Sequence, residues 1–271
     1  MRNLNFLLLV SVIAIIGCTE ESLVVPENDQ IVVRAYLYTG KPVEEIQISS
    51  TFLLDEEIET APVINDAQIS LIRDSRRFQL IPSPGDSGYY HYPGEDLIIL
   101  AGEKYLIEVD YFGSIATAQT IVPPAPTDVS LSSNLLVVPD FSNFTRGSRP
   151  EFDNFTFTAY WNNDDNKFFY LVIDNLGSNP PPIDAPFAGK MANFISQPVR
   201  SDSFVVSVGM VTHLGSHRLI VYRINQEYAD MYEWRNQDSR DLNEPLTNIE
   251  NGLGVFSAFN SDSLFFEVEM D

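Results

Sequence analysis

Apolar side chains recur at every second position in many short segments of this chain, separated by turn-forming residues. Between Lys104 and Tyr111, for example, Tyr105, Ile107 and Val109 fall on one face of the segment, and Glu108 and Asp110 fall on the other. This period places the apolar set on one face of an extended strand, so each segment predicts a strand that covers a core with one side. Similar segments are 31–38, 45–50, 67–73, 77–81, 89–92, 115–122, 152–161, 168–174, 204–211, 218–225, 255–259 and 264–270.

A proline-rich segment divides the series of strands. Val122 to Pro126 contains three prolines, which remove backbone donors and end any strand. We therefore expect two immunoglobulin- or fibronectin-like β-sandwich domains, at 30–122 and 151–271, joined by a linker and loop at 123–150. Residues 226–240 break the period-two pattern and predict one helix in the second domain.

Charge excludes two classes of partner. The chain has 271 residues with 16 basic against 38 acidic side chains, a formal net charge of −22. A nucleic acid or an anionic membrane surface would be repelled, so neither is expected to bind. With three histidines and one cysteine, the chain has few groups for a zinc site and cannot form an internal disulfide.

The first residues predict export and lipid attachment. Arg2 precedes an apolar run from Phe6 to Ile16, which is too short for a membrane-spanning helix of roughly 20 residues but typical of a secretory signal. The run ends in a segment that resembles a lipobox, with Cys18 as the acylated residue. Residues 1–17 would then be a removed lipoprotein signal peptide and 18–29 a tether. An ordinary signal peptide with a chance cysteine is the alternative.

Several acyl chains would anchor the mature protein to a membrane. Each buried methylene contributes about 0.8 kcal/mol, so two or three chains make attachment close to permanent. The acidic pair Glu20 and Glu21 resembles the tag by which some Gram-negative bacteria export lipoproteins to the cell surface. We expect an outer-membrane location with the protein facing outward.

Four segments resemble one family across nearly the mature length. They are 33–38 (VRAYLY), 62–69 (PVINDAQI), 83–90 (SPGDSGYY) and 248–256 (NIENGLGVF). On these motifs the chain is similar to the lipoprotein family catalogued as domain of unknown function 4249. The resemblance implies a Bacteroidota-type surface or outer-membrane lipoprotein, often encoded near TonB-dependent receptors. It implies no activity and therefore no catalytic residue.

Two patterns resemble catalytic or metal motifs without the context that such motifs need. Ser87 lies in a segment similar to the nucleophile loop of chymotrypsin-type proteases, but all three histidines follow it in the chain, against the order of that fold. The same residues make an ordinary hairpin turn. His213 and His217 have the spacing of a helical metal pair, but they flank a predicted turn, where that spacing has no meaning.

An acidic turn is the candidate for calcium. Asp164 and Asp165 lie in an Asn-Asp segment that offers the hard oxygens that calcium prefers. The segment lies between two strong strands, where Asn and Asp are also the usual turn residues, and it lacks the EF-hand pattern. A structural calcium site is the functional interpretation, and a plain turn is the alternative; no cofactor is expected.

Three aromatic residues lie where a sandwich core cannot easily absorb them. Phe141, Phe144 and Phe187 occur in stretches rich in Pro, Ser, Gly and Asn. Exposed aromatic residues on loops suit contact with carbohydrate or protein, although loop aromatics also cap cores. These three are the candidate ligand-binding residues.

Taken together, these features predict a non-enzymatic, lipid-anchored accessory or binding component, plausibly of a TonB-dependent receptor system. The alternative is a structural or adhesive envelope protein that binds glycan or matrix. An enzyme ranks third, because it would need an Asp/Glu pair that the sequence alone does not bring together.

Overall fold

The computed structural model describes residues 30–52, 60–139, 155–183, 193–235 and 246–271. These residues are mainly β, with one α-helix among them, which confirms the predicted class. The predicted signal peptide, Cys18 and the whole tether lie outside the described residues, as do Phe141, Phe144 and Phe187. Among the helices described, none combines the length and the apolar character needed to span a bilayer.

Seven strands form the first half of the fold. They are β1 (Ile31–Tyr38), β2 (Ile46–Ser50), β3 (Gln68–Arg73), β4 (Arg76–Pro82), β5 (Tyr89–His91), β6 (Lys104–Tyr111) and β7 (Ser114–Ile121). They pair in the order β1-β2-β5-β4-β3-β6-β7. In β1 and β6 every second side chain is buried in one hydrophobic cluster, as the period-two pattern predicts.

The second half has two layers. Its strands are β8 (Ser130–Leu131), β9 (Leu135–Val138), β10 (Thr156–Tyr160), β11 (Phe168–Asn175), β12 (Phe194–Ile195), β13 (Ser203–Ser207) and β14 (Gly215–Ile224). A 3-10 turn, η4 (Val208–Met210), follows β13. The sheet β13-β10-β8 faces the sheet that contains β11 and β14, and Phe157 and Phe169 lie in the hydrophobic cluster between them. The arrangement is a sandwich.

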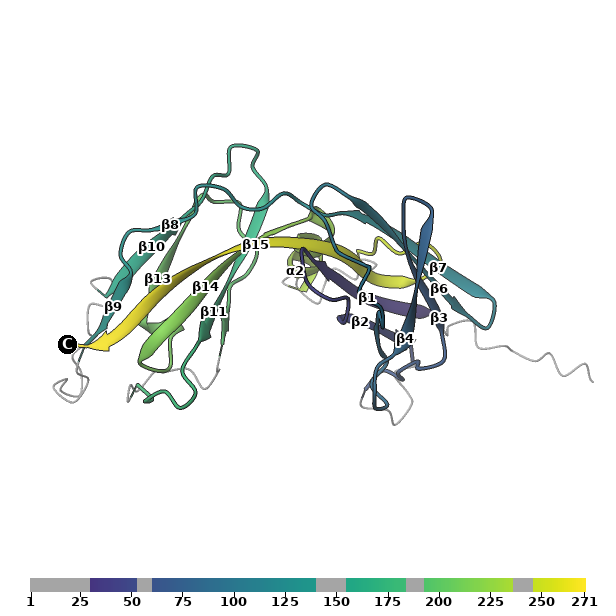
Figure 1. The fold of residues 1–271 in the computed structure, drawn as a ribbon, viewed down its shortest axis with the longest axis horizontal. Helices are drawn as coiled ribbons and strands as arrows, with labels where there is room; N and C mark the ends of the chain where they lie inside the picture. Colours follow the sequence, from purple (N-terminus) through teal and green to yellow (C-terminus); the bar gives the residue numbers. More distant parts are fainter. Residues whose placement is uncertain (1–29, 53–59, 140–154, 184–192, 236–245) are drawn as a thin grey trace, which may run out of the picture.

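One long strand belongs to both halves. β15 (Leu253–Met270) pairs parallel to β1 along its first residues, antiparallel to β14 along Phe259–Val268, and parallel to β9 at its end. Figure 1 shows it running from the first half into the second. Phe256 packs into the first core and Phe266 into the second. The predicted domain boundaries, at 30–122, 123–150 and 151–271, stay predictions.

The two strands expected at 255–259 and 264–270 are one continuous strand. The polar residues between them, Asn260 to Ser263, indicate a turn by composition, yet they pair with Ile220 to Arg223 of β14. Pairing supplies their backbone groups with partners, so the strand continues through a segment of low β-propensity.

A third hydrophobic cluster lies where the halves meet. Phe259 is fully buried, stacks on Tyr38 with a ring-centroid distance of 5.0 Å, and meets the edges of Tyr36 and Tyr228 at 5.5 Å and 4.8 Å. Burial raises the pKa of Tyr36 to about 12, so its phenol stays protonated. We call this cluster, with Tyr170 and Tyr222, the junction core.

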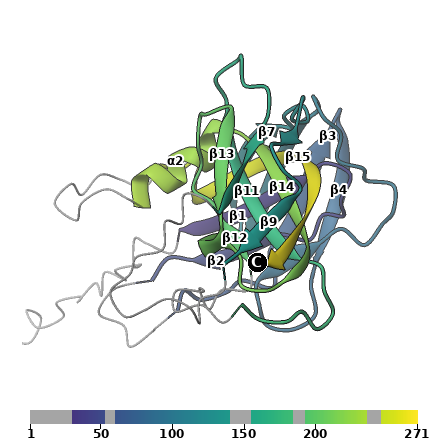
Figure 2. The ribbon, with the colours of Figure 1, turned by 90° about the vertical axis from the view of Figure 1, so that its left-hand side faces the viewer.

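The helix α2 (Gln226–Arg235) begins where the sequence predicts, at residue 226, and is described to Arg235. It lies to one side of the strands in Figure 2. Glu227 stands in the first turn, where the helix dipole favours an acid, and Ala229 is fully buried in the junction core. The helix therefore covers the region between the halves.

Candidate functional site

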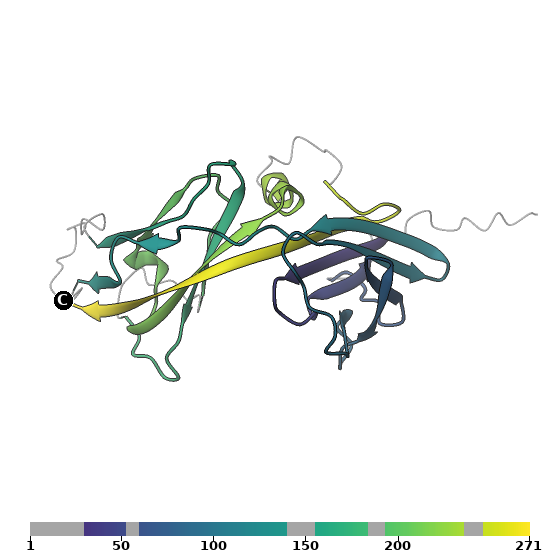
Figure 3. The same ribbon diagram turned by 45° about the horizontal axis from the view of Figure 1, so that its top comes forward.

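The segment that follows β7 is held against the second half by side-chain amides. Asn225 donates from Nδ2 to the carbonyl oxygen of Ile121 (2.8 Å) and Asn260 to that of Pro123 (2.9 Å). Pro123 cannot donate a backbone hydrogen bond, and its carbonyl oxygen accepts the one from Asn260. Figure 3 shows the segment running beside β15. The proline-rich segment is thus a fixed part of the structure along this stretch.

A cleft opens at this contact between the halves. Its volume is about 620 Å³, which lies within the range of about 300–1,000 Å³ typical of small-ligand sites. Both halves line it, through 102, 104 and 119–124 on one side and 166–168, 200 and 223–227 on the other.

The lining combines cations with apolar surface. Among the lining residues that the structure describes, Lys104, Lys167, Arg200 and Arg223 are basic and Glu227 is the one acid. The apolar part comes from Ile121, Val122, Pro123, Pro124, Phe168 and Ile224. The cleft can therefore hold a ligand that is charged at one point and apolar elsewhere.

Two of the basic residues are held by aromatic rings. The guanidinium carbon of Arg200 lies 4.0 Å from the ring centroid of Phe168, and its Nη2 donates to Oε1 of Gln226 at 3.1 Å. Arg223 pairs with Asp165 and lies 6.0 Å from the ring centroid of Phe169. Cation–π contacts restrict these side chains and leave other N–H groups of each fork as donors.

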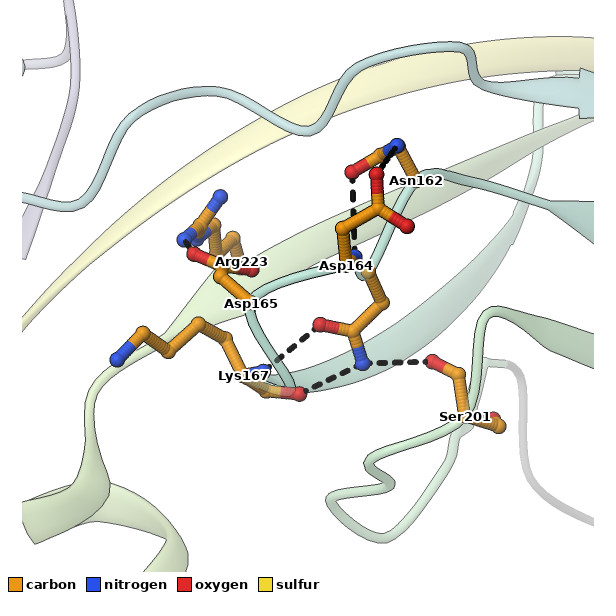
Figure 4. Close-up of polar contacts among 7 residues, drawn as sticks. Asn162, Asp164, Asp165, Lys167, Ser201 and Arg223 are labelled. Atoms are coloured by element: carbon orange, nitrogen blue, oxygen red, sulfur yellow. Dashed lines mark hydrogen bonds and ion pairs between the residues drawn. The ribbon is translucent and has the colours of Figure 1, made fainter.

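The predicted calcium turn adjoins this cleft, because Asn166 and Lys167, which follow Asp165, belong to its lining. Figure 4 shows the contacts of the turn. Asp165 pairs with Arg223, and Oδ2 of Asp164 accepts from Nδ2 of Asn162 at 2.9 Å. Asn163 closes the loop, accepting from the Lys167 backbone N–H at 2.7 Å and donating to carbonyl oxygens across it. These hydrogen bonds are the ones expected of an ordinary Asn-Asp turn.

Among the described residues, no group of three or more His, Cys, Asp or Glu side chains is placed to hold a metal ion. The calcium site at Asp164 and Asp165 therefore stays a sequence prediction, and the contacts in the structure belong to the turn.

The histidines are bound elsewhere than at Ser87. Nδ1 of His91 lies 3.0 Å from Oγ of Ser83, and Nδ1 of His213 lies 2.8 Å from Oγ1 of Thr212. Oγ of Ser87 accepts from the backbone N–H of Tyr89. The structure thus gives Ser87 the contacts of a turn residue and places no imidazole against it.

His217 is a buried strand residue rather than half of a metal pair. It is 2% exposed, stacks on Phe266 with ring centroids 5.2 Å apart, and contacts the carbonyl oxygen of Gly215 through Nδ1 at 2.8 Å. Burial lowers its pKa, so the imidazole is neutral near pH 7.

Sequence reasoning missed the cleft. Its four cations are spread from residue 104 to residue 223 and form no local motif. The one signal in the sequence is that basic residues are few. The chain has only 16 of them, and a quarter lie in the described lining of this cleft.

A family model matches residues 19–264, which is most of the chain. The chain belongs to the family described as Domain of unknown function (DUF4249). The match spans both halves of this DUF4249 chain and the cleft between them. A search of curated proteins finds no match to it.

Two solved structures of adhesins are similar to this DUF4249 chain at low identity. One is a 1.5-MDa bacterial ice-binding adhesin, with 11% identity and a TM-score of 0.23 over 90% of this chain and 66% of that one. The other is a Ca²⁺-stabilized adhesin of an Antarctic bacterium that binds ice, with 9% identity, a TM-score of 0.22, and coverage of 90% and 50%. The chain thus spans less than two thirds of either, and the functional argument rests on its own residues.

Proposed function

We propose that this protein is a lipid-anchored, non-enzymatic binding protein of the bacterial outer membrane, exposed at the cell surface. The observation that carries the binding role is the cleft of about 620 Å³ between the halves. Sites between two packed units are among the commonest places for small-ligand binding. The lipid anchor rests on the lipobox-like segment before Cys18.

The cleft is suited to binding because its walls are fixed in the free protein. Thr120 donates from Oγ1 to Oε1 of Glu227 at 2.8 Å and accepts from Nδ2 of Asn225 at 3.0 Å. These bonds join β7 to the start of α2 across the floor of the contact. Binding then costs little conformational entropy in the protein, so more of the contact energy appears as affinity.

Its partner in this proposal is an outer-membrane receptor. Support comes from the lipoprotein family that the chain resembles, whose members are often encoded near TonB-dependent receptors, and from the membership of residues 19–264 in that family. The acidic surface, with a net charge of −22, suits a solvated extracellular face.

Lipid attachment and location in the outer membrane are tested together by labelling cells with an alkyne fatty acid. The native chain is expected to take up label and to fractionate with outer membranes, whereas Cys18→Ala is expected to do neither. Glu20→Gln, two residues away, serves as the matched control for acylation. Label on Cys18→Ala would refute the anchor.

Partner and orientation are tested by crosslinking in intact outer membranes followed by mass spectrometry. Recovery of a receptor supports the accessory role. Crosslinks to glycan or matrix without any receptor would instead favour the adhesive alternative. Protease added to intact cells is expected to degrade the native chain, and protection from it would overturn the surface location.

A further inference from the structure

The charge balance of the cleft is the reverse of that of the chain. Acidic residues outnumber basic ones by 38 to 16 overall, yet the described part of the lining holds Lys104, Lys167, Arg200 and Arg223 against Glu227 alone. A surface that is acidic nearly everywhere therefore has a local cationic concavity. Such a concavity focuses a positive potential on whatever enters it.

Three of these four cations form no ion pair with the described residues. Among the residues that the structure describes, the ion pairs include Arg223 with Asp165 but none from Lys104, Lys167 or Arg200. Lys104, Lys167 and Arg200 are exposed. In Figure 4 the Lys167 side chain extends from the acidic turn with no bond drawn to its Nζ.

The single acid of the lining is already occupied. Oε1 of Glu227 accepts from Oγ1 of Thr120 at 2.8 Å and from Oγ of Ser257 at 3.3 Å. It binds hydroxyls of the scaffold and forms no ion pair with the lining cations that the structure describes. The described lining therefore has four basic residues against one acid, and this excess of basic residues is left for a ligand.

We infer that this cleft binds the oxyanion of a small ligand, a carboxylate or a phosphate group, with the ligand's less polar part against Ile121, Pro124 and Phe168. Lys and Arg are the side chains that bind such groups, and Arg200 is held in place by Phe168 and Gln226. This inference rests on the proposed binding function and names the ligand chemistry of the same cleft.

The net charge of the chain does not prevent this binding. At physiological ionic strength the Debye length is about 8 Å, so acidic groups farther away are largely screened. Cations in direct contact with the bound group are screened much less. Local charge therefore decides the sign of the interaction in the cleft.

The test is calorimetric titration of the purified full chain with three probes. Trigalacturonate carries carboxylates, inorganic phosphate is the second oxyanion, and maltotriose is a neutral sugar. At least one of the two anions is expected to bind and maltotriose is not. Whichever anion binds more tightly identifies the source of the oxyanion, while binding of neither, or of maltotriose as tightly, would overturn the inference.

Variants assign the binding to the cleft. Lys104→Gln and Lys167→Gln are each expected to weaken binding about tenfold, the effect of one charge-assisted hydrogen bond. Lys41→Gln removes the same charge from an exposed turn outside the lining and should leave affinity unchanged. Equal losses in all three variants, or none in the two cleft variants, would refute the site.

A variant with the opposite sign tests the role of Arg223. Asp165→Asn releases Arg223 from its partner, so affinity for the bound anion is expected to rise by up to about fivefold. If the affinity does not rise, Arg223 does not bind the anion.

Far-ultraviolet circular dichroism of each variant verifies folding. Fatty-acid labelling and crosslinking to the receptor are independent of these titrations, so a failure here leaves the lipid anchor and the receptor role standing.

Discussion

Thr120 of β7 donates a hydrogen bond of 2.8 Å to Glu227 in the first turn of α2, across 107 residues of sequence. Thr120 is 4% exposed, so the bond is shielded from water on its side. It joins a strand of the first half to the helix of the second. The contact fixes one wall of the cleft against the other, and its loss is expected to loosen both.

Replacing Thr120 by valine tests this contact. Thr120→Val keeps the shape of the side chain and removes the hydroxyl, which leaves Glu227 and Asn225 each without one partner. A loss of about 1–3 kcal/mol in the free energy of unfolding is expected from urea denaturation. Thr117→Val on the same strand is the control, because its bond to Glu250 is long at 3.4 Å. Equal effects of the two would contradict the claim.

Gly254 stands at the start of β15 with a backbone that only glycine tolerates. Its φ is +105°, and a Cβ there would lie 2.0 Å from the carbonyl oxygen of Val33. Gly254→Ala is expected to cost about 3 kcal/mol or more, measured by thermal or urea unfolding. Gly113→Ala, at φ +84° with no atom within 4 Å of its Cβ, should cost only about 1–2 kcal/mol.

Phe259 is expected to be the residue of β15 on which the junction core depends most. Phe259→Ala removes a fully buried ring that contacts Tyr36, Tyr38 and Tyr228, so about 3–5 kcal/mol of stability should be lost. Phe265→Ala on the same strand is the control, since that ring is 63% exposed. Fluorescence-monitored denaturation compares them, and a similar loss in both would count against a junction core.

His217 predicts a dependence of stability on pH. Because burial lowers its pKa in the folded protein, the unfolded chain takes up the proton first as pH falls below about 6.5. The unfolded state is then favoured, so the free energy of unfolding should decrease as pH falls through this window. His217→Gln should reduce that slope. The test is to measure the free energy of unfolding between about pH 7 and pH 5. An unchanged slope in His217→Gln would refute the role of His217.

Some parts of the candidate site could be predicted from the sequence, and others form only when the chain folds. Ser87, His217 and Asp165 resemble motif residues by type and spacing, yet the structure places Ser87 and Asp165 in turns and His217 in β14. The cleft cations could not be predicted because they lie far apart in the sequence and come together only where the two halves meet. Phe141, Phe144, Phe187 and Cys18 keep their predicted roles as predictions, since they lie outside the described residues.

The sequence by itself determined the β class, the positions of most strands and the start of the helix. Period-two burial is a local property, so residues such as Ile107 and Val109 fix their own face wherever the strand is placed. Only the tertiary structure decided that β15 is one strand. Asn260 to Ser263 are polar enough for a turn, and pairing with β14 keeps them extended. The cleft follows from that long-range pairing, because β15 brings both halves together and local patterns carry no record of distant neighbours.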